Sequence, residues 1–140
     1  MIVALDVGTK RIGVAVADPG LTFALPIATI QRSNRREDFA RIEAMLETYA
    51  VTELVVGDPI TLAGERGIAA QAMDAFVEDL RARFAGPIHR VDERLTTAQA
   101  TKSLIAADVG RRKRRDVVDS LAAALILDSF LARRRNSRES

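Results

Sequence analysis

An acidic residue lies near the end of the first apolar segment of the chain. Ile2–Val7 reads Ile-Val-Ala-Leu-Asp-Val, a short run rich in branched side chains, and Gly8 follows it. Such a run predicts a buried β-strand that ends at the glycine. A buried carboxylate is unfavourable unless a basic side chain or a bound cation compensates its charge. Asp6 is therefore either the salt-bridge partner of Lys10 or Arg11, or a metal ligand at the carboxyl end of a first strand.

The apolar segments that follow predict one mixed sheet. Residues 12–17 form a second apolar run after a short turn, which indicates an antiparallel hairpin, and residues 21–30 form a third extended segment in which Pro26 favours an edge or a bend. Helical spacing then predicts helices through 39–49, 69–84, 96–107 and 116–131, with Ser33 or Asn34 as the first cap and strands at 54–57 and 88–91. This order predicts an α/β fold in which helices cover a mixed sheet whose first three strands are antiparallel.

Size and composition predict a single domain. The chain has 140 residues, 48% of them hydrophobic, which is enough for one core. It has no cysteine, which excludes disulfides and cysteine–histidine zinc sites. It shows no secretory signal and no apolar run long enough to cross a bilayer, so we expect a cytoplasmic protein without membrane contact. We assign residues 1–132 to the domain and residues 133–140 to a basic C-terminal tail.

Basic side chains are clustered, although the formal net charge is only +2. Residues 111–115 form an unbroken basic run, and residues 133–138 contain a second cluster. Aromatic residues make up only 4% of the chain, so basic contacts with phosphates are expected rather than base stacking. Arg112, Lys113 and Arg114 are therefore candidate substrate-binding residues. The C-terminal cluster could also be a solubilising tail.

Two further acids are candidates for the same site as Asp6. Glu93 comes just after the last predicted strand, and Asp119 lies in the otherwise apolar last helix. Functional sites in such sheets gather beyond the carboxyl ends of parallel strands, where a helix could bring Asp119 beside the other two. Three carboxylates repel one another unless a cation neutralises them, and Mg²⁺ or Mn²⁺, as one or two ions, could assist phosphodiester hydrolysis there. Alternatively, Glu93 pairs with Arg90 or Arg94, and Asp119 is a helix N-terminal acid.

Several motifs resemble the YqgF family, also called the pre-16S ribosomal RNA nuclease or Holliday junction resolvase family. The resemblance runs in order over nearly the whole chain. It rests on the segments Leu5-Asp6-Val7-Gly8-Thr9-Lys10-Arg11-Ile12-Gly13, Val55-Val56-Gly57-Asp58-Pro59 and Val91-Asp92-Glu93-Arg94-Leu95-Thr96-Thr97, and on Asp119 with Ala122-Ala123.

The resemblance implies a ribonuclease H-like fold with a central five-stranded mixed sheet. It also implies that Asp6, Glu93 and Asp119 are catalytic metal ligands of a nuclease that matures the 5′ end of 16S ribosomal RNA in bacteria. The partners would then be structured RNA and the ribosome or its precursor. The alternative within the same chemistry is cleavage of branched, four-way DNA by a symmetric dimer, so a monomer or a homodimer is expected.

The sequence departs from the family pattern after the predicted strand at 54–57. Asp58, Thr61 and Ala63 stand where the family commonly has leucine, asparagine and aspartate, which weakens a substrate role for this loop. Related resolvases place an active-site acid at the end of the fourth strand, so we consider Asp58 a further candidate metal ligand. The alternative is an exposed acid that begins a turn with Pro59.

Three basic residues lie beside the candidate acids. Lys10 and Arg11 follow Asp6, and Arg94 follows Glu93; each could bind a substrate phosphate or pair with the acids when no metal is bound. His89 is expected to be structural. A two-domain nucleotide-binding ATPase is disfavoured by size. A non-catalytic RNA-binding or assembly protein stays open, although phosphate binding does not need three acids.

Overall fold

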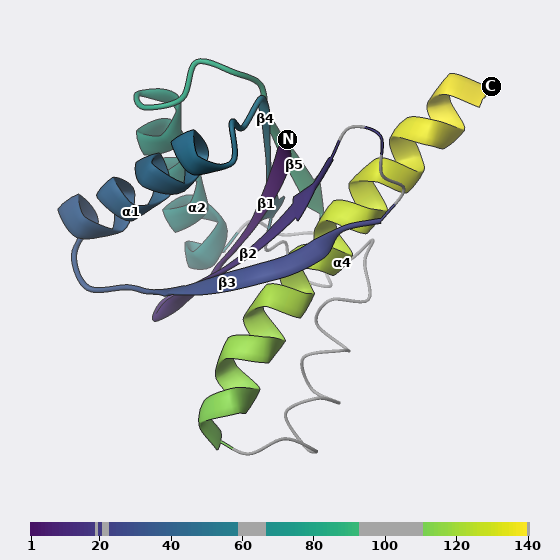
Figure 1. Ribbon diagram of the computed structural model, residues 1–140. Helices are drawn as coiled ribbons and strands as arrows, with labels where there is room; N and C mark the ends of the chain where they lie inside the picture. The colour runs from purple at the N-terminus through teal and green to yellow at the C-terminus, as the bar shows by residue number, and fades with distance from the viewer. Residues whose placement is uncertain (19, 21–22, 59–66, 93–110, 140) are drawn as a thin grey trace.

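The computed structural model describes residues 1–18, 20, 23–58, 67–92 and 111–139, apart from the side chains of 69, 111–118 and 138–139. The elements are β1 (Ile2–Val7), β2 (Arg11–Ala17), β3 (Leu25–Gln31), α1 (Arg35–Thr48), β4 (Glu53–Asp58), α2 (Ile68–Arg81), β5 (Ile88–Asp92) and α4 (Arg111–Glu139). Figure 1 shows the strands in one layer, with α1 and α2 on one side and the long α4 on the other.

The five strands form one mixed sheet in the order β3-β2-β1-β4-β5. β2 is antiparallel to β1 and to β3, whereas β4 is parallel to β1 and to β5. The predicted fold class is therefore confirmed, including the antiparallel first three strands. Pro26 lies on β3, which is an edge strand, as its missing N–H requires.

Side chains alternate between the two faces of the sheet, and each face has its own hydrophobic core. Ala4 and Ala15 point toward α4, where they pack with Ala123 and Leu127. The intervening residues point the other way, and Leu5 packs in the core that α1 and α2 cover. Small side chains on the α4 face let that helix lie close to the sheet. The central strands are thus buried on both faces, which explains their continuous apolar runs.

Helix α1 begins where the sequence predicts. Asn34 is its N-cap, and its side chain accepts a hydrogen bond from the backbone N–H of Glu37 at 2.9 Å. This bond satisfies one of the N–H groups that a helix start leaves without a partner. The alternative cap, Ser33, instead donates its hydroxyl to the Glu37 carboxylate. Helix α2 begins at Ile68, and its N-cap, Gly67, makes no side-chain cap bond.

Several predicted boundaries differ from the structure. β3 begins at Leu25, not at residue 21, and α2 ends at Arg81 instead of 84. α4 extends beyond the predicted 116–131 at both ends, because the basic runs that flank the apolar segment are good helix formers and continue it. The predicted helix at 96–107 lies outside the described residues.

The C-terminal half of α4 is attached to the sheet by a polar cluster. Arg134 donates two hydrogen bonds to the Glu53 carboxylate, at 3.1 and 2.6 Å, and its guanidinium lies over the ring of Phe130. His89 contacts the same carboxylate at 2.9 Å, in the structural role expected for it. The bond from Arg134 lowers the pKa of Glu53, although desolvation opposes the shift. This arginine of the predicted tail is therefore docked on the fold; the domain boundary at 132 stays a prediction.

No helix within the described parts of the chain is both long and apolar enough to cross a membrane.

Candidate active site

Asp6 lies on the face of the sheet that α4 covers. It follows Ile2 and Ala4 at every second position of β1, and both of those residues pack against α4. Only 3% of Asp6 is exposed. The prediction of a carboxylate on a buried strand is therefore confirmed. Its position near the carboxyl end of β1 is where α/β sheets commonly place ligands.

The main chain of α4 reaches the sheet next to Asp6. Gly13 is the register partner of Asp6 on β2. A Cβ atom on Gly13 would come within 1.9 Å of the Asp119 carbonyl oxygen and 2.2 Å of its carbonyl carbon. The absence of a side chain at Gly13 is thus what allows this close approach. Through Gly13, the fold brings Asp119 to the strand position beside Asp6, although 113 positions separate the two acids in the sequence.

The Asp119 carboxylate is paired with the β1–β2 hairpin. Arg11 donates a hydrogen bond from Nε to Asp119 Oδ2 at 2.8 Å, and the two side chains are 23% and 15% exposed. Of the two roles predicted for Arg11, this structure contains the ion pair with an acid. The alternative that Asp119 is a helix N-terminal acid is wrong, because α4 begins at Arg111 and Asp119 lies more than two turns inside it.

Other predicted site residues fall outside the described part of the chain. They are Glu93 and Arg94, together with the side chains of Arg112, Lys113 and Arg114. The backbone of 111–114 is the first turn of α4. Lys10 is described and exposed in the β1–β2 turn. Among the described side chains, no three acids or histidines gather as a metal site. The triad of Asp6, Glu93 and Asp119 therefore stays a prediction.

Asp58 lies at the carboxyl end of β4 but takes a different partner. Alternation from Val56 places it on the face that α2 covers, where 7% of the residue is exposed. Arg90 donates a hydrogen bond to Asp58 at 3.1 Å and another to Asp74 of α2 at 2.6 Å. The alternative of an exposed loop acid is thus wrong, and the structure does not bring Asp58 to the face on which Asp6 lies. Its role as a metal ligand stays a prediction.

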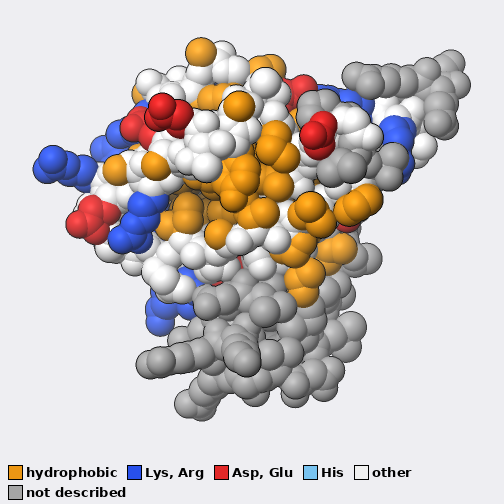
Figure 2. All heavy atoms as spheres, viewed as in Figure 1, with side chains coloured by type: hydrophobic (Ala, Val, Ile, Leu, Met, Phe, Trp, Pro, Cys, Tyr) orange, Lys and Arg blue, Asp and Glu red, His pale blue; other side chains and the backbone are white. Residues whose placement is uncertain are grey.

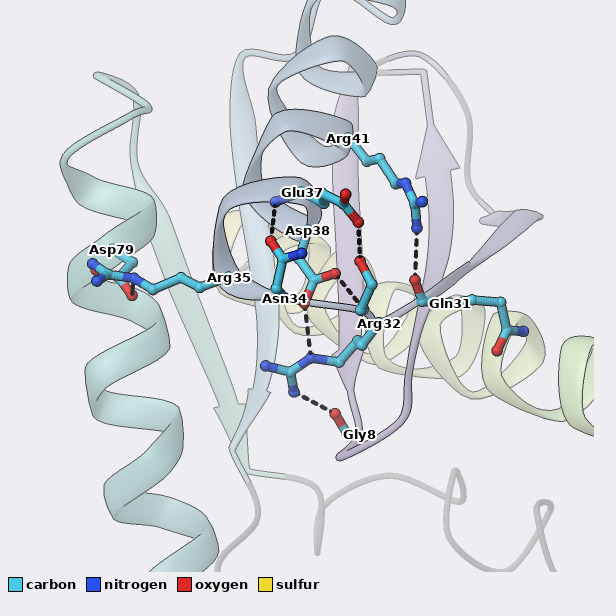
Figure 3. A network of polar contacts seen from close by, with 10 residues as sticks. Gly8, Gln31, Arg32, Asn34, Arg35, Glu37, Asp38, Arg41 and Asp79 are labelled. Carbon is cyan, nitrogen blue, oxygen red and sulfur yellow. Dashed lines mark hydrogen bonds and ion pairs between the residues drawn. The ribbon is translucent and has the colours of Figure 1, made fainter.

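A network that the sequence did not reveal holds the turn after Asp6. Arg32 donates a hydrogen bond to the Gly8 carbonyl at 2.6 Å, and the Arg32 backbone N–H donates to the Lys10 carbonyl at 2.9 Å. Asp38, only 3% exposed, accepts from the Ser33 backbone at 2.9 Å and pairs with Arg32 at 3.5 Å. Figure 3 shows Arg32 between Asp38 and Gly8. The one sequence signal that could have indicated this network is the acid Asp38 in the first turn of the helix.

The donors present suit a hard divalent cation. Asp6 and Asp119 supply carboxylate oxygens on one face of the sheet, at the end of a strand, with the Asp119 backbone against the neighbour of Asp6. Mg²⁺ is typically held by one or two protein carboxylates, completed by water and by phosphate oxygens of the substrate. The described part of the site meets that requirement.

The comparison of sequences decides the family. A family model described as RuvX, Holliday junction resolvase, matches residues 1–133. The chain belongs to the RuvX family. Within it, the chain is 46% identical over 132 residues to a protein of Moorella thermoacetica named "Putative pre-16S rRNA nuclease", and the match covers 94% of each chain. A protein of Desulforudis audaxviator with the same name is 42% identical over 99% of each chain.

The fold of the chain is similar to that of two solved structures. The structure of T. thermophilus RuvC in complex with a Holliday junction substrate superposes with a TM-score of 0.53 at 14% identity, over 92% of this chain and 93% of that one. A second Thermus thermophilus RuvC structure gives a TM-score of 0.52 at 13% identity, over 96% of each chain. The likeness confirms the ribonuclease H-like fold, and the family match confirms the resemblance to YqgF. Both printed family names are those of nucleases, so the expected enzyme class, a hydrolase acting on nucleic acid, is confirmed.

Proposed function

We propose that this protein is a divalent-metal-dependent endonuclease that cleaves structured RNA, with the 5′ end of the 16S ribosomal RNA precursor as its substrate. The observation that carries the proposal is the placement of two distant carboxylates, Asp6 and Asp119, on one face at the carboxyl end of β1. The name of the relatives that are 42–46% identical over nearly the full chain supports the choice of RNA.

Asp6, Glu93 and Asp119 would hold Mg²⁺ or Mn²⁺. Such an ion, when bound, activates water and neutralises the charge that develops on the phosphate. The buried strand β1 fixes the position from which Asp6 would contact the ion. Asp119 is held by Arg11 and would exchange that partner for the cation. Glu93 enters the proposal from the sequence alone.

The basic residues around the acids would bind the substrate. Lys10 and Arg11 of the β1–β2 turn are next to Asp6, and Arg94 follows Glu93. The first turn of α4 contains Arg112, Lys113 and Arg114, which are five to seven residues before Asp119. With Asp119 serving as a metal ligand, Arg11 would be available to contact a phosphate oxygen, for which a guanidinium is well suited.

The second candidate is resolution of four-way DNA junctions, which the description of the matched family model favours. Such an enzyme cuts two strands in concert and so acts as a symmetric dimer. A protein that remains monomeric with bound junction DNA would count against this function. RNA differs from DNA at the 2′-hydroxyl, which gives the two candidates distinguishable substrates.

Cleavage assays on matched substrates test both candidates. We would compare a precursor 16S RNA 5′ segment with a four-way DNA junction, in Mg²⁺ or Mn²⁺. Asp6→Asn, which keeps the shape of the side chain, should abolish cleavage and leave the circular dichroism spectrum unchanged. Equal cleavage by the two proteins would defeat the proposed site. Specific RNA binding without cleavage by the wild type would favour a non-catalytic assembly protein.

Asp58 is a further proposed ligand of the same ion, supported by its position at the end of β4. Because its side chain lies on the α2 face, it would have to reach the ion around the end of the sheet. Calorimetry of Mn²⁺ binding to Asp58→Asn tests it. Loss of affinity would place Asp58 in the cluster. An unchanged affinity would restrict Asp58 to its ion pair with Arg90.

A further inference from the structure

A groove of about 800 Å³ lies beside the β1–β2 turn, on the side of α1 and α2. The turn, the end of β3, the start of α1 and the outer face of α2 line it. Its charged lining residues are Lys10, Arg11, Arg32, Arg35, Asp38 and Asp79. Arg11 also contacts Asp119, so this residue links the groove to the candidate active site on the other face of the sheet.

A second groove of about 570 Å³ continues from the first past Arg35 and Phe39, which line both. It adds Arg36 and Arg83 as basic residues and Glu43 as an acid. We name the six basic residues of the two grooves the basic track: Lys10, Arg11, Arg32, Arg35, Arg36 and Arg83. Figure 2 shows blue side chains along the side of the molecule where Figure 1 places α1, whereas hydrophobic side chains occupy the middle of this face.

The six basic residues of the track outnumber its three lining acids, Asp38, Asp79 and Glu43. Glu43 is half exposed and pairs with Arg83 at 3.5 Å. Asp38 is only 3% exposed and is turned toward Arg32 and the Ser33 backbone. Asp79 pairs with Arg35, whose side chain keeps 69% of its surface exposed. The pair is bidentate, and a phosphate that binds Arg35 would replace the Asp79 carboxylate as its partner. Figure 3 shows Arg35 extended from α1 to Asp79 on α2, across the groove.

The track is suited to phosphates and not to bases. Phe39 and Phe76, the aromatic residues that line the first groove, are 3% and 6% exposed, and their rings pack on each other with centroids 4.9 Å apart. They leave no open ring face on which a base could stack. At the N-terminus of α1, the Asn34 side chain accepts from the Glu37 N–H group. The basic side chains of the track supply the attraction for phosphates.

We propose that one strand of the substrate leaves the active site over Lys10 and follows the basic track past Arg35 toward Arg83, held by its phosphates. This inference rests on the proposed nuclease function. It adds a binding site for a single-stranded flank, independent of base sequence. Phosphate contacts of this kind set the register of the strand on the protein without reading it.

A charge pair at Ala75 provides the sharpest test. Ala75 is an exposed helical residue that lines the first groove. Ala75→Glu and Ala75→Lys both keep helix propensity but change the groove charge in opposite directions. We would measure binding of a labelled RNA hairpin with a single-stranded flank, in EDTA so that no cleavage occurs. Ala75→Lys should tighten binding several-fold and Ala75→Glu should weaken it several-fold. A change of fold would move both variants the same way.

Position 136 is the matched control. Asn136 is exposed near the C-terminal end of α4, the helix that covers the opposite face of the sheet from α1 and α2. The sheet therefore lies between this position and the track. Asn136→Glu and Asn136→Lys should bind the RNA like the wild type. If the two positions give the same response, the track is not the path of the strand.

The salt dependence provides a second readout. Lys10→Gln with Arg35→Gln should reduce the slope of log affinity against log salt by about 1.4, since each single-strand phosphate contact contributes about 0.7. Removing the flank from the RNA should abolish the difference from wild type. An unchanged slope, together with normal cleavage by the wild type, would contradict the proposed path of the strand but not the nuclease function. Normal binding of the flank without any cleavage would contradict the nuclease function but not the proposed path.

Discussion

The Asp119 backbone lies directly against Gly13, so closely that a single added carbon would come within 1.9 Å of the Asp119 carbonyl oxygen. This contact positions α4 on the sheet and sets Asp119 beside the register partner of Gly13, which is Asp6. The two acids therefore occupy neighbouring positions on the α4 face because the residue between them, Gly13, has no side chain.

Gly13→Ala should displace α4 and uncouple the two acids. Because the clash is with helix backbone, which cannot rotate away, we expect a loss of about 3 kcal/mol in the free energy of unfolding and a severe loss of cleavage. Urea unfolding measures the first. Gly67→Ala is the control, since nothing lies within 4 Å of a Cβ there; it should stay within about 1 kcal/mol of wild type. Equal stability of the two variants would contradict the contact.

Arg11→Gln should tighten metal binding. In the structure the Arg11 guanidinium bonds to Asp119, so a cation must displace it. For a partly exposed pair worth up to about 1 kcal/mol, its removal should raise Mn²⁺ affinity about threefold in calorimetry. Lys10→Gln removes the same charge from the neighbouring position and should raise the affinity less. If the two variants behave alike, general repulsion by basic residues, and not the Arg11–Asp119 pair, opposes the metal.

Arg32→Lys should impair turnover more than binding. The substitution keeps the charge of the basic track but loses the hydrogen bond that Arg32 donates to Gly8 at 2.6 Å. A loosened turn would misplace Asp6 relative to Arg11, and kcat should fall about tenfold, with the salt dependence of RNA binding unchanged. Arg83→Lys is matched, because Arg83 also belongs to the track and makes the same kind of bond to the Asp79 carbonyl of α2, at 2.9 Å, instead of to the turn. A similar fall in kcat for both would show that the effect is not specific to the turn.

Arg134→Gln should reduce the sensitivity of the fold to acid. Arg134 holds the pKa of Glu53 below its usual value of 4.5. The folded state then binds fewer protons than the unfolded state, so this stabilisation is present above pH 4.5 and is lost as the pH falls through the lowered pKa. At pH 7 the variant should lose about 1 kcal/mol in urea unfolding, and the gap to wild type should close below pH 4.

Arg135→Gln is the control for this cluster, because Arg135 is exposed one residue further along α4. It should follow the wild type at every pH. A gap between wild type and Arg134→Gln that stayed constant from pH 7 to pH 3 would show that the Glu53 carboxylate does not carry the effect.

The strands and the first candidate ligand could be predicted from local pattern. Apolar runs of five to seven residues specify strands wherever both faces of a sheet are buried, and Asp6 stands out because it interrupts one of them. Asn34 was one of two predicted caps for the same reason, since capping is a local interaction. The order of elements then restricted the topology to one mixed sheet.

The partners of the charged residues depended on tertiary structure. Asp58 and Asp6 both end strands of the same sheet, yet alternation turns one toward α2 and Arg90 and the other toward α4. Likewise, the pairing of Arg11 with Asp119 spans 108 positions, and no periodicity reports it. The sequence by itself determined which residues form strands and which acids need a partner, because backbone geometry and desolvation act locally. Only the tertiary structure decided which residues are their partners. Charged residues that are far apart in the sequence come into contact because the sheet has a fixed register and because α4 packs directly against Gly13.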